Sequence, residues 1–439
     1  MRILIGIIVL FILLLSFLNS FWKTSSVEGN RMIADFESID AIWMSCLANT
    51  NYMKIENEVV NKMENNINVM ITMVDNQEVK ECKEFFDISS YNNDLLSYSV
   101  FKGNDFWIRD HGPVFVYNKF GDLAVVNFEW SQYGVRSFYR DYFQENSQLV
   151  DLKMSMLNIE NKRNVDSLIA VNLKLPIVKS WICIEGGAME TNGNGSIILN
   201  KSLLYQRNPG VTIKAIEDEF KRVLGTVNFI WLNAGLVEDV HIVGTIVDNY
   251  VGIGTGGHTD EFVRFADPKT ILLAWVPEED KDLNPINKLN YERLSESYKI
   301  LKQAKDIDGS PFKIIKIPQP KLITQRIRVN AGDSIDNTLN LPEFVFRPSE
   351  GFQAGDSLIR VACASYLNYF LTNSKVFLQS YVNHGTNIEY ENQVIRTFKI
   401  AFPSREIVPV DARSLNWYGG GLHCATMSQF HRKVKSPQP

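Results

Sequence analysis

One supersecondary pattern recurs along this chain of 439 residues: short apolar strands joined by a tight turn, with an amphipathic helix before the next strand. The chain opens with strand, helix and strand at 41–74 and a hairpin at 106–128, and the pattern recurs at 183–224, 254–305 and 376–410. Repeated units of this kind predict an α/β fold, either a ring-like propeller of ββαβ-type modules with a central site or two doubly wound domains.

The polar loops of these copies carry a matched set of reactive side chains. They are Asp110 in WIRDHGP, Glu185 in EGG, His258 and Asp260 in GHTDE, and Cys424 in GGGLHC. Two carboxylates can bind a planar guanidinium through paired, charge-assisted hydrogen bonds. They then position its central carbon in front of a thiolate. The residue types therefore indicate chemistry on a guanidino group.

Cys424 follows three consecutive glycines, 419–421, which leave the backbone free to approach a ligand closely. A buried structural cysteine is the alternative for this stretch taken alone. The neighbouring His423 is expected to be structural, because in an extended segment its side chain points away from that of Cys424.

These motifs, in this order, resemble those of the agmatine deiminase and Porphyromonas-type peptidylarginine deiminase family, a branch of the guanidine-modifying penteins. The resemblance runs from about 33 to 429. It implies a five-bladed α/β propeller (pentein fold) and a covalent cysteine mechanism. We therefore expect a single pentein catalytic domain over 30–432.

Carried over to this sequence, the family pattern implies that Cys424 is the nucleophile and His258 the general acid and then base. Asp110 and Asp260 would clamp the guanidinium, and Glu185 would orient His258. The products would be a ureido compound and ammonia. The reaction needs no cofactor, and no further ligand stands at zinc spacing from His258 and Asp260, so no metal is expected.

Trp107 and Arg109 are expected to hold their loop, and Trp107 also to contact the substrate. The carboxylates around Cys424 should raise the pKa of its thiol, because like charges oppose thiolate formation. The charge of the substrate, or of a protonated His258, must then favour the thiolate.

The substrate stays open between two guanidino compounds. We expect agmatine, converted to N-carbamoylputrescine, in part because Glu261 adds negative charge that suits an amine tail. The alternatives are peptidyl-arginine, converted to peptidyl-citrulline, and a catalytically silent pentein that only binds a guanidino ligand or a protein. The stretch 323–355 is longer than usual in the family and could reshape the mouth of the site.

The N-terminus differs from the rest of the chain. Arg2 precedes an apolar run at 3–18, so residues 1–26 are expected to be a signal peptide, or else an uncleaved membrane anchor. The enzyme would then be secreted or periplasmic, or anchored with its catalytic domain outside the cytoplasm.

The composition favours a small cationic partner over a nucleic acid, because 45 basic and 50 acidic residues are mixed throughout, with a net charge of −5. Five cysteines stand far apart, and apolar strings such as Ile182-Cys183-Ile184 favour buried free thiols, although pairs among four of the five are possible. These four are Cys46, Cys82, Cys183 and Cys363.

Overall fold

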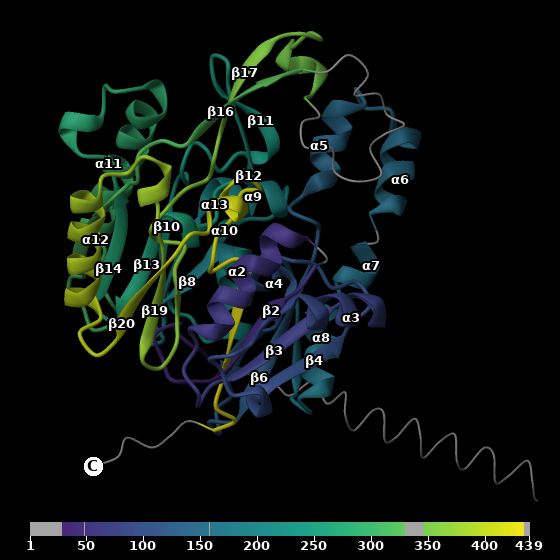
Figure 1. The fold of residues 1–439 in the computed structure, drawn as a ribbon, viewed down its shortest axis with the longest axis vertical. Helices are drawn as coiled ribbons and strands as arrows, with labels where there is room; N and C mark the ends of the chain where they lie inside the picture. The colour runs from purple at the N-terminus through teal and green to yellow at the C-terminus, as the bar shows by residue number, and fades with distance from the viewer. Residues whose placement is uncertain (1–28, 48, 158, 330–345, 434–439) are drawn as a thin grey trace, which may run out of the picture.

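The computed structural model describes residues 29–47, 49–157, 159–329 and 346–433 (Figure 1). The expected leader at 1–26 lies outside the described residues, as does the central part of 323–355. In the described part of the chain, no helix has both the length and the apolar character needed to cross a membrane.

The strands of the described residues form six small sheets. Five of these sheets share one plan, in which an antiparallel strand pair is followed by a third strand parallel to the second. They are β21 (Thr426–Phe430), β2 (Ile39–Ser45) and β3 (Asn68–Met73); β5 (Val114–Tyr117), β6 (Leu123–Glu129) and β7 (Ile177–Cys183); β8 (Met189–Thr191), β9 (Ser196–Asn200) and β10 (Asn228–Leu232); β13 (Val263–Asp267), β14 (Thr270–Trp275) and β15 (Lys313–Pro318); and β18 (Phe370–Leu371), β19 (Lys375–Gln379) and β20 (Glu406–Val410). The predicted α/β fold is confirmed, and the alternative of two doubly wound domains is wrong.

Helices connect the parallel strands, which a tight turn cannot join. In Figure 1, α11 and α12 lie on the outer side of β14 and β19. The longer connecting helices are α2 (Thr50–Asn61), α10 (Ile213–Leu224), α11 (Pro285–Gln303) and α12 (Ile388–Ala401). The shorter elements are β1 (Arg31–Met32), α3 (Asn76–Phe85), β4 (Leu96–Val100), α4 (Ile108–His111), α5 (Val135–Tyr142), α6 (Ser147–Met156), α7 (Ile159–Lys162), α8 (Val165–Asn172), η2 (Gly186–Ala188), α9 (Lys201–Arg207), η3 (Thr259–Glu261) and α13 (Arg413–Asn416).

The hydrophobic pattern of the sequence predicts helices over 55–66 and 290–305, but side-chain caps place both helix starts earlier. The side chain of Asn284 accepts a hydrogen bond from the Asn287 N–H at 2.8 Å, so α11 begins before the predicted range 290–305. Asn49 caps α2 in the same way, ahead of the predicted range 55–66. The first turns of both helices are polar, so apolar spacing does not indicate where these helices begin.

A sixth sheet departs from the common plan and lies at the top of the molecule in Figure 1. It consists of β11 (His241–Val247), β12 (Tyr250–Thr255), β17 (Ser357–Val361) and β16 (Thr324–Arg328), in that order. The stretch 323–355, expected to be an enlarged connection, thus supplies β16. The loop of His258 leaves directly from β12.

A buried guanidinium at the centre joins four segments. Arg264 on β13 is fully buried, and its Nε donates to Glu190 Oε2 at 2.9 Å, while Nη2 donates to Asp35 Oδ2 at 2.9 Å. Its Nη1 donates to the carbonyl oxygens of Leu367 and Tyr369 at 3.2 and 3.0 Å. These contacts tie β8, β13, the segment after β1 and the approach to β18 together.

Two of the cysteines are paired. Cys46 after β2 forms a disulfide with Cys82 on α3, with the two Cα atoms 6.7 Å apart. Cys183, Cys363 and Cys424 are buried free thiols. The prediction of free thiols is therefore confirmed for Cys183 and Cys363 and wrong for Cys46 and Cys82, because folding brings together positions that are 36 residues apart.

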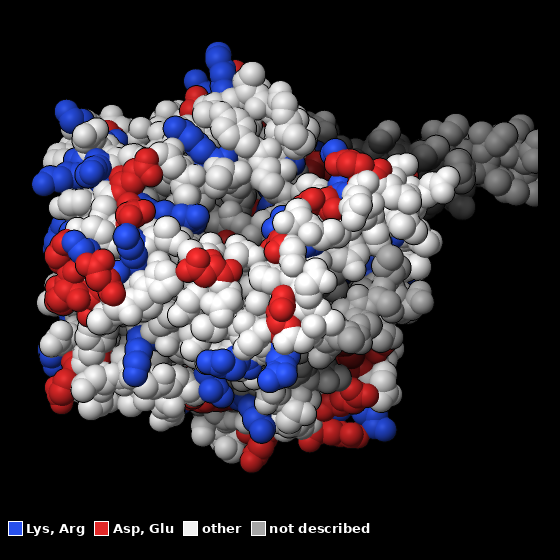
Figure 2. All heavy atoms as spheres, turned by 90° about the horizontal axis from the view of Figure 1, so that it is seen from above, with Lys and Arg blue, Asp and Glu red and all other residues white. Residues whose placement is uncertain are grey.

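The face shown in Figure 2 carries acidic and basic side chains interspersed with each other and separated by uncharged surface. Mixed charge of this kind gives no single-sign field that would steer a polyanion to this face. Buried charged side chains, among them Arg264, Glu190 and Asp260, lie inside the molecule.

Replacing Arg264 by Met should lower the free energy of unfolding by about 3–5 kcal/mol, because Glu190 and Asp35 would lose a buried partner. Urea unfolding followed by circular dichroism measures this loss. Arg136→Met is the matched control, since Arg136 pairs with Asp151 on the exposed surface, where such a pair is worth ~1 kcal/mol or less. Equal losses in the two variants would contradict a structural role of Arg264 at the centre.

Candidate active site

Cys424 lies in the turn between α13 and β21 and is 2% exposed. Its Sγ lies 3.0 Å from Asn368 Nδ2, 3.5 Å from Asp260 Oδ2 and 3.8 Å from Glu261 Oε1. The backbone N–H of Cys424 also donates to Asn368 Oδ1 at 3.3 Å. The thiol is thus held between an amide donor and two acidic side chains.

The imidazole of His258 lies among three carboxyl groups. Its Nε2 is 3.4 Å from Glu185 Oε2, and its Nδ1 is 3.5 Å from Asp110 Oδ1 and 4.0 Å from Asp260 Oδ1. Asp260 also contacts Cys424, so the structure brings all five predicted site residues into one buried cluster. They come from α4, the segment before η2, η3 and its preceding loop, and the turn before β21.

Gly187 leaves room inside this cluster. A Cβ at this position would lie 2.8 Å from His258 Nδ1 and 2.9 Å from both Asp110 Oδ1 and Asp260 Oδ2. His258 Nδ1 and Asp260 Oδ1 are buried and have no hydrogen-bond partner among the described residues. Buried polar atoms of this kind normally have a partner, so they mark a place for a ligand. The carboxylate oxygens of Asp260 and Asp110 accept hydrogen bonds and therefore suit a ligand rich in N–H groups.

The carboxylates set the charge of His258. Burial opposes a charged ring, but Asp110, Glu185 and Asp260 outweigh it and raise the pKa of His258 to about 9. Burial raises the pKa of Asp110 to about 7, with Asp260 and Glu185 adding to the effect. At neutral pH His258 is therefore protonated and can donate a proton.

The same carboxylates disfavour the charged form of the Cys424 thiol. Burial, followed by the charges of Asp260, Glu261 and Asp110, raises the pKa of Cys424 well above its ordinary value. This is the direction expected from the sequence. A thiolate therefore needs a cation beside it, which a bound guanidinium or His258 can supply.

Glu261 does not lie where an amine tail would need it. Its side chain is buried, with Oε1 accepting from Asn368 Nδ2 at 2.8 Å and facing Cys424. Burial and the neighbouring carboxylates of Asp260, Asp239 and Glu238 raise the pKa of Glu261 well above the ordinary value. The expectation that Glu261 adds charge for the substrate tail is wrong.

Three supporting residues have no motif in the sequence that would reveal them. Asn368 binds Cys424, and Arg207 Nε donates to Glu185 Oε1 at 2.8 Å, which helps to lower the pKa of Glu185 to about 2 although burial opposes this. Asp239 Oδ2 accepts the backbone N–H groups of Gly257 and His258 at 2.9 and 2.8 Å. Each is an isolated polar residue far from its partner in sequence.

Arg109 holds the strand that follows Cys424. Its Nε donates to Thr426 O at 3.0 Å, and its backbone N–H donates to Cys424 O at 3.2 Å. His423 differs from its expected orientation, because the segment is a turn and not extended. Its Nδ1 lies 2.7 Å from Asp260 Oδ2, so the ring points into the cluster.

A cavity of about 240 Å³ reaches Cys424 and Asp110 from outside. Trp107 lines it, and the other walls are mainly aromatic and apolar. The lining includes Tyr52, Phe106, Tyr133, Leu157, Ile242, Val243, Ile253 and Tyr418. The strands β11 and β12 of the sixth sheet and the segment that contains α5 supply part of the wall, so the sheet that departs from the common plan shapes the approach to the site.

Asp260, Glu261 and Cys424 are also the group in the described residues whose ligand atoms lie close enough to share a metal ion, all within 4.8 Å of one another. The same atoms belong to the cluster around the thiol. Their arrangement is explained by the contacts of Cys424 itself.

The chain matches the Porphyromonas-type peptidyl-arginine deiminase family over residues 31–429. A protein of Latilactobacillus sakei named "Putative agmatine deiminase" is 27% identical over 339 residues, which cover 76% of this chain and 77% of that protein. A protein of Mycoplasma mycoides with the same name is 23% identical over 422 residues, covering 93% and 97%.

Among solved structures, the agmatine deiminase of Enterococcus faecalis superposes with a TM-score of 0.69 at 20% identity, covering 92% of this chain and 96% of that chain. At this identity the likeness shows a shared fold. The family match spans nearly the whole described chain and includes the segments of Cys424, His258, Asp260, Asp110 and Glu185. The chain therefore belongs to the Porphyromonas-type peptidyl-arginine deiminase family.

Proposed function

We propose that this protein is a deiminase, a C–N hydrolase that converts a guanidino group to a ureido group and releases ammonia. The observation that carries the proposal is the space beside Gly187, where unpaired atoms of His258 and Asp260 converge with Asp110 next to the Cys424 thiol. A guanidinium offers the N–H groups and the positive charge that the carboxylates of Asp260 and Asp110 can bind.

In the first half of the reaction, Asp110 and Asp260 bind the guanidinium. Its positive charge favours the Cys424 thiolate, which forms as the thiol releases its proton to solvent. The sulfur attacks the central carbon, and the protonated His258 donates its proton to the departing nitrogen. The C–N bond breaks, ammonia leaves, and an amidino-thioether remains on Cys424.

In the second half, the now neutral His258 takes a proton from a water molecule, which attacks the same carbon. The C–S bond breaks, the ureido product forms, and the sulfur leaves as a thiolate. Glu185, fixed by Arg207, keeps the ring of His258 in place through both steps. No cofactor is needed for this balance.

Agmatine is the substrate that we propose first. Two observations support it: similar proteins carry the name agmatine deiminase, and the cavity of about 240 Å³ suits a small molecule. The aromatic walls of Tyr52, Trp107 and Tyr133 can hold a cationic tail through cation–π contacts. Peptidyl-arginine is the alternative, favoured by the family description and by the expected export.

We also propose that the five sheets of common plan are the blades of a closed α/β propeller around this site. The support is that β21, near the end of the chain, pairs with β2, near its beginning. The loops at the site come from four of these sheets, as a ring with a central site requires.

Cys424→Ser should abolish turnover while leaving the fold intact, because an alcohol lacks the acidity and nucleophilicity that attack on a guanidinium requires. Ammonia release from agmatine, free arginine and a blocked peptidyl-arginine, measured side by side, should show agmatine as the best substrate. The loss of turnover in Cys424→Ser should be at least about a thousandfold, which corresponds to a barrier higher by about 4 kcal/mol.

Cys183→Ser is the matched control, since Cys183 is another buried thiol that does not line the cavity. Turnover of peptidyl-arginine alone would favour the alternative substrate. The absence of ammonia from all three compounds, together with tight binding of one of them, would favour a catalytically silent pentein.

We propose further that the protein is exported. The apolar run at 3–18 supports this, as does the disulfide between Cys46 and Cys82, since disulfides persist in oxidising compartments. N-terminal sequencing of the protein recovered outside the cytoplasm should show a chain that begins after about residue 20 to 26. An intact Met1 in a membrane fraction would favour the anchor, and an intact cytosolic chain would contradict both forms.

A further inference from the structure

His423 is held between two carboxylates. Its Nδ1 lies 2.7 Å from Asp260 Oδ2 and its Nε2 lies 2.6 Å from Asp35 Oδ2. The ring is 3% exposed, and the Asp35 side chain that it contacts is 16% exposed. The imidazole thus links Asp260, beside the Cys424 thiol, to Asp35 in the segment between β1 and β2.

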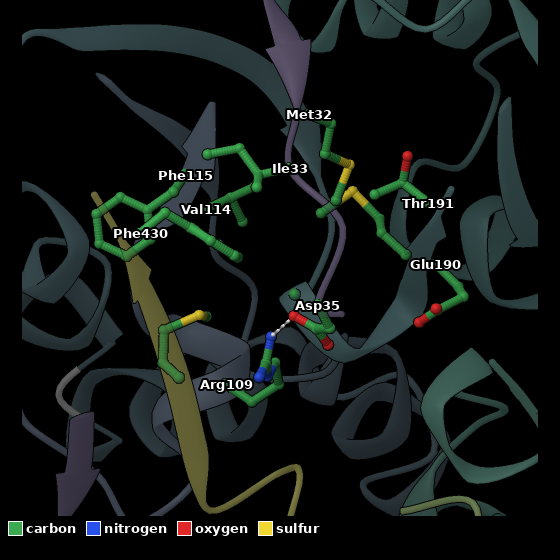
Figure 3. Close-up of a pocket in the computed structure, with 12 residues that line it drawn as sticks. Met32, Ile33, Asp35, Arg109, Val114, Phe115, Glu190, Thr191 and Phe430 are labelled. Carbon is green, nitrogen blue, oxygen red and sulfur yellow. Dashed lines mark hydrogen bonds and ion pairs between the residues drawn. The ribbon is translucent and has the colours of Figure 1, made fainter. Parts of the chain in front are cut away.

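Asp35 is fixed by two arginines. Arg109 Nη1 lies 3.3 Å from Asp35 Oδ1, and Arg264 Nη2 lies 2.9 Å from Asp35 Oδ2. Figure 3 shows Asp35 and Arg109 facing each other at the edge of a cavity of about 40 Å³, large enough for one or a few water molecules. Although burial opposes it, these cations and His423 lower the pKa of Asp35 well below its ordinary value.

The two short contacts define the protonation of His423. Burial, Arg109 and Arg264 lower the pKa of His423, but the carboxylates on its two nitrogens are both ionised. A neutral imidazole has one N–H and can donate to only one of them. Both contacts are satisfied only if both ring nitrogens carry a proton, so we assign the charged ring.

The two oxygens of Asp260 have different surroundings. Oδ2 contacts His423 and lies 3.5 Å from Cys424 Sγ, whereas Oδ1 has no hydrogen-bond partner among the described residues and lies 4.0 Å from His258 Nδ1. The bond to His423 therefore fixes the rotation of the carboxylate. It also places a positive charge beside the oxygen that would otherwise repel a thiolate.

We infer that His423 and Asp35 are positioning residues for deimination. His423, held by Asp35, turns Oδ1 of Asp260 toward the guanidinium and offsets the charge of Oδ2 beside the thiol of Cys424. This inference rests on the proposed function for its use in the reaction, although its effect on the thiol needs no substrate.

Alkylation of Cys424 by iodoacetamide, followed by mass spectrometry of its peptide, tests the effect on the thiol. At a pH below the pKa of the thiol, His423→Gln should slow the reaction about tenfold, because loss of a nearby positive charge raises a thiol pKa by about one unit. His384→Gln is the matched control, since His384 forms another ion pair with an aspartate, Asp411, outside the site. The control should react at the wild-type rate.

Protection by agmatine, measured over times too short to deplete it, tests the effect on the clamp. The agmatine concentration that halves the alkylation rate should rise about tenfold in both His423→Gln and Asp35→Asn, because Oδ1 of Asp260 is no longer held toward the guanidinium. The buried thiols of Cys183 and Cys363 should stay unreactive in each variant, which reports an intact fold.

Alkylation of Cys363 would show that a variant is misfolded. If this occurs in His423→Gln, His423→Asn replaces it in both experiments. Wild-type alkylation and wild-type protection in folded variants of His423 would overturn the inference. If agmatine fails to protect even the wild-type protein, the proposed substrate is wrong, while the alkylation rates without ligand still decide the role of His423.

Discussion

The buried contact between Arg264 and Asp35 is the interaction on which the rest of the structure depends. It joins β13 to the segment between β1 and β2, and the same Asp35 contacts Arg109 and His423. Arg109 in turn holds the carbonyl of Cys424 through its backbone N–H. The position of the thiol and the packing of the sheets are therefore set by one network.

A network of this kind explains how a site with so many acidic groups can be buried. Asp110, Glu185, Asp260 and Glu261 lie within one cluster, and each would be costly to bury alone. Arg207 compensates Glu185, and His423 compensates Asp260. Asp110 contacts His258, the hydroxyl of Tyr133 and the backbone N–H of Gly187, and no arginine pairs with it among the described residues, so a bound cation would compensate its charge.

The sequence predicted the parts of the fold and the site that local chemistry determines. Alternating apolar runs and turn residues revealed the strands, and the polar loops revealed Cys424, His258, Asp260, Asp110 and Glu185. The resemblance to a family added their proposed roles. The starts of α2 and α11 were missed because caps such as Asn284, and not apolar spacing, determine where those helices begin.

Contacts between distant segments could not be read in the same way. Asp239, Arg207 and Asn368 act on the site through single hydrogen bonds from separate elements, and no local pattern marks them. The predicted orientation of the His423 side chain is wrong because it rests on an extended segment. The three glycines before it allow a turn instead. The disulfide between Cys46 and Cys82 likewise depends on how α3 packs beside the first sheet.

The central claim is that the Cys424 sulfur becomes covalently bound to the guanidino carbon. Rapid acid quenching of the enzyme during turnover of agmatine, followed by mass spectrometry of its peptides, tests this most directly. The account predicts an amidino adduct on the peptide that contains Cys424, and none on those that contain Cys183 or Cys363. Ammonia release without any adduct on Cys424, or an adduct on another cysteine, would contradict it.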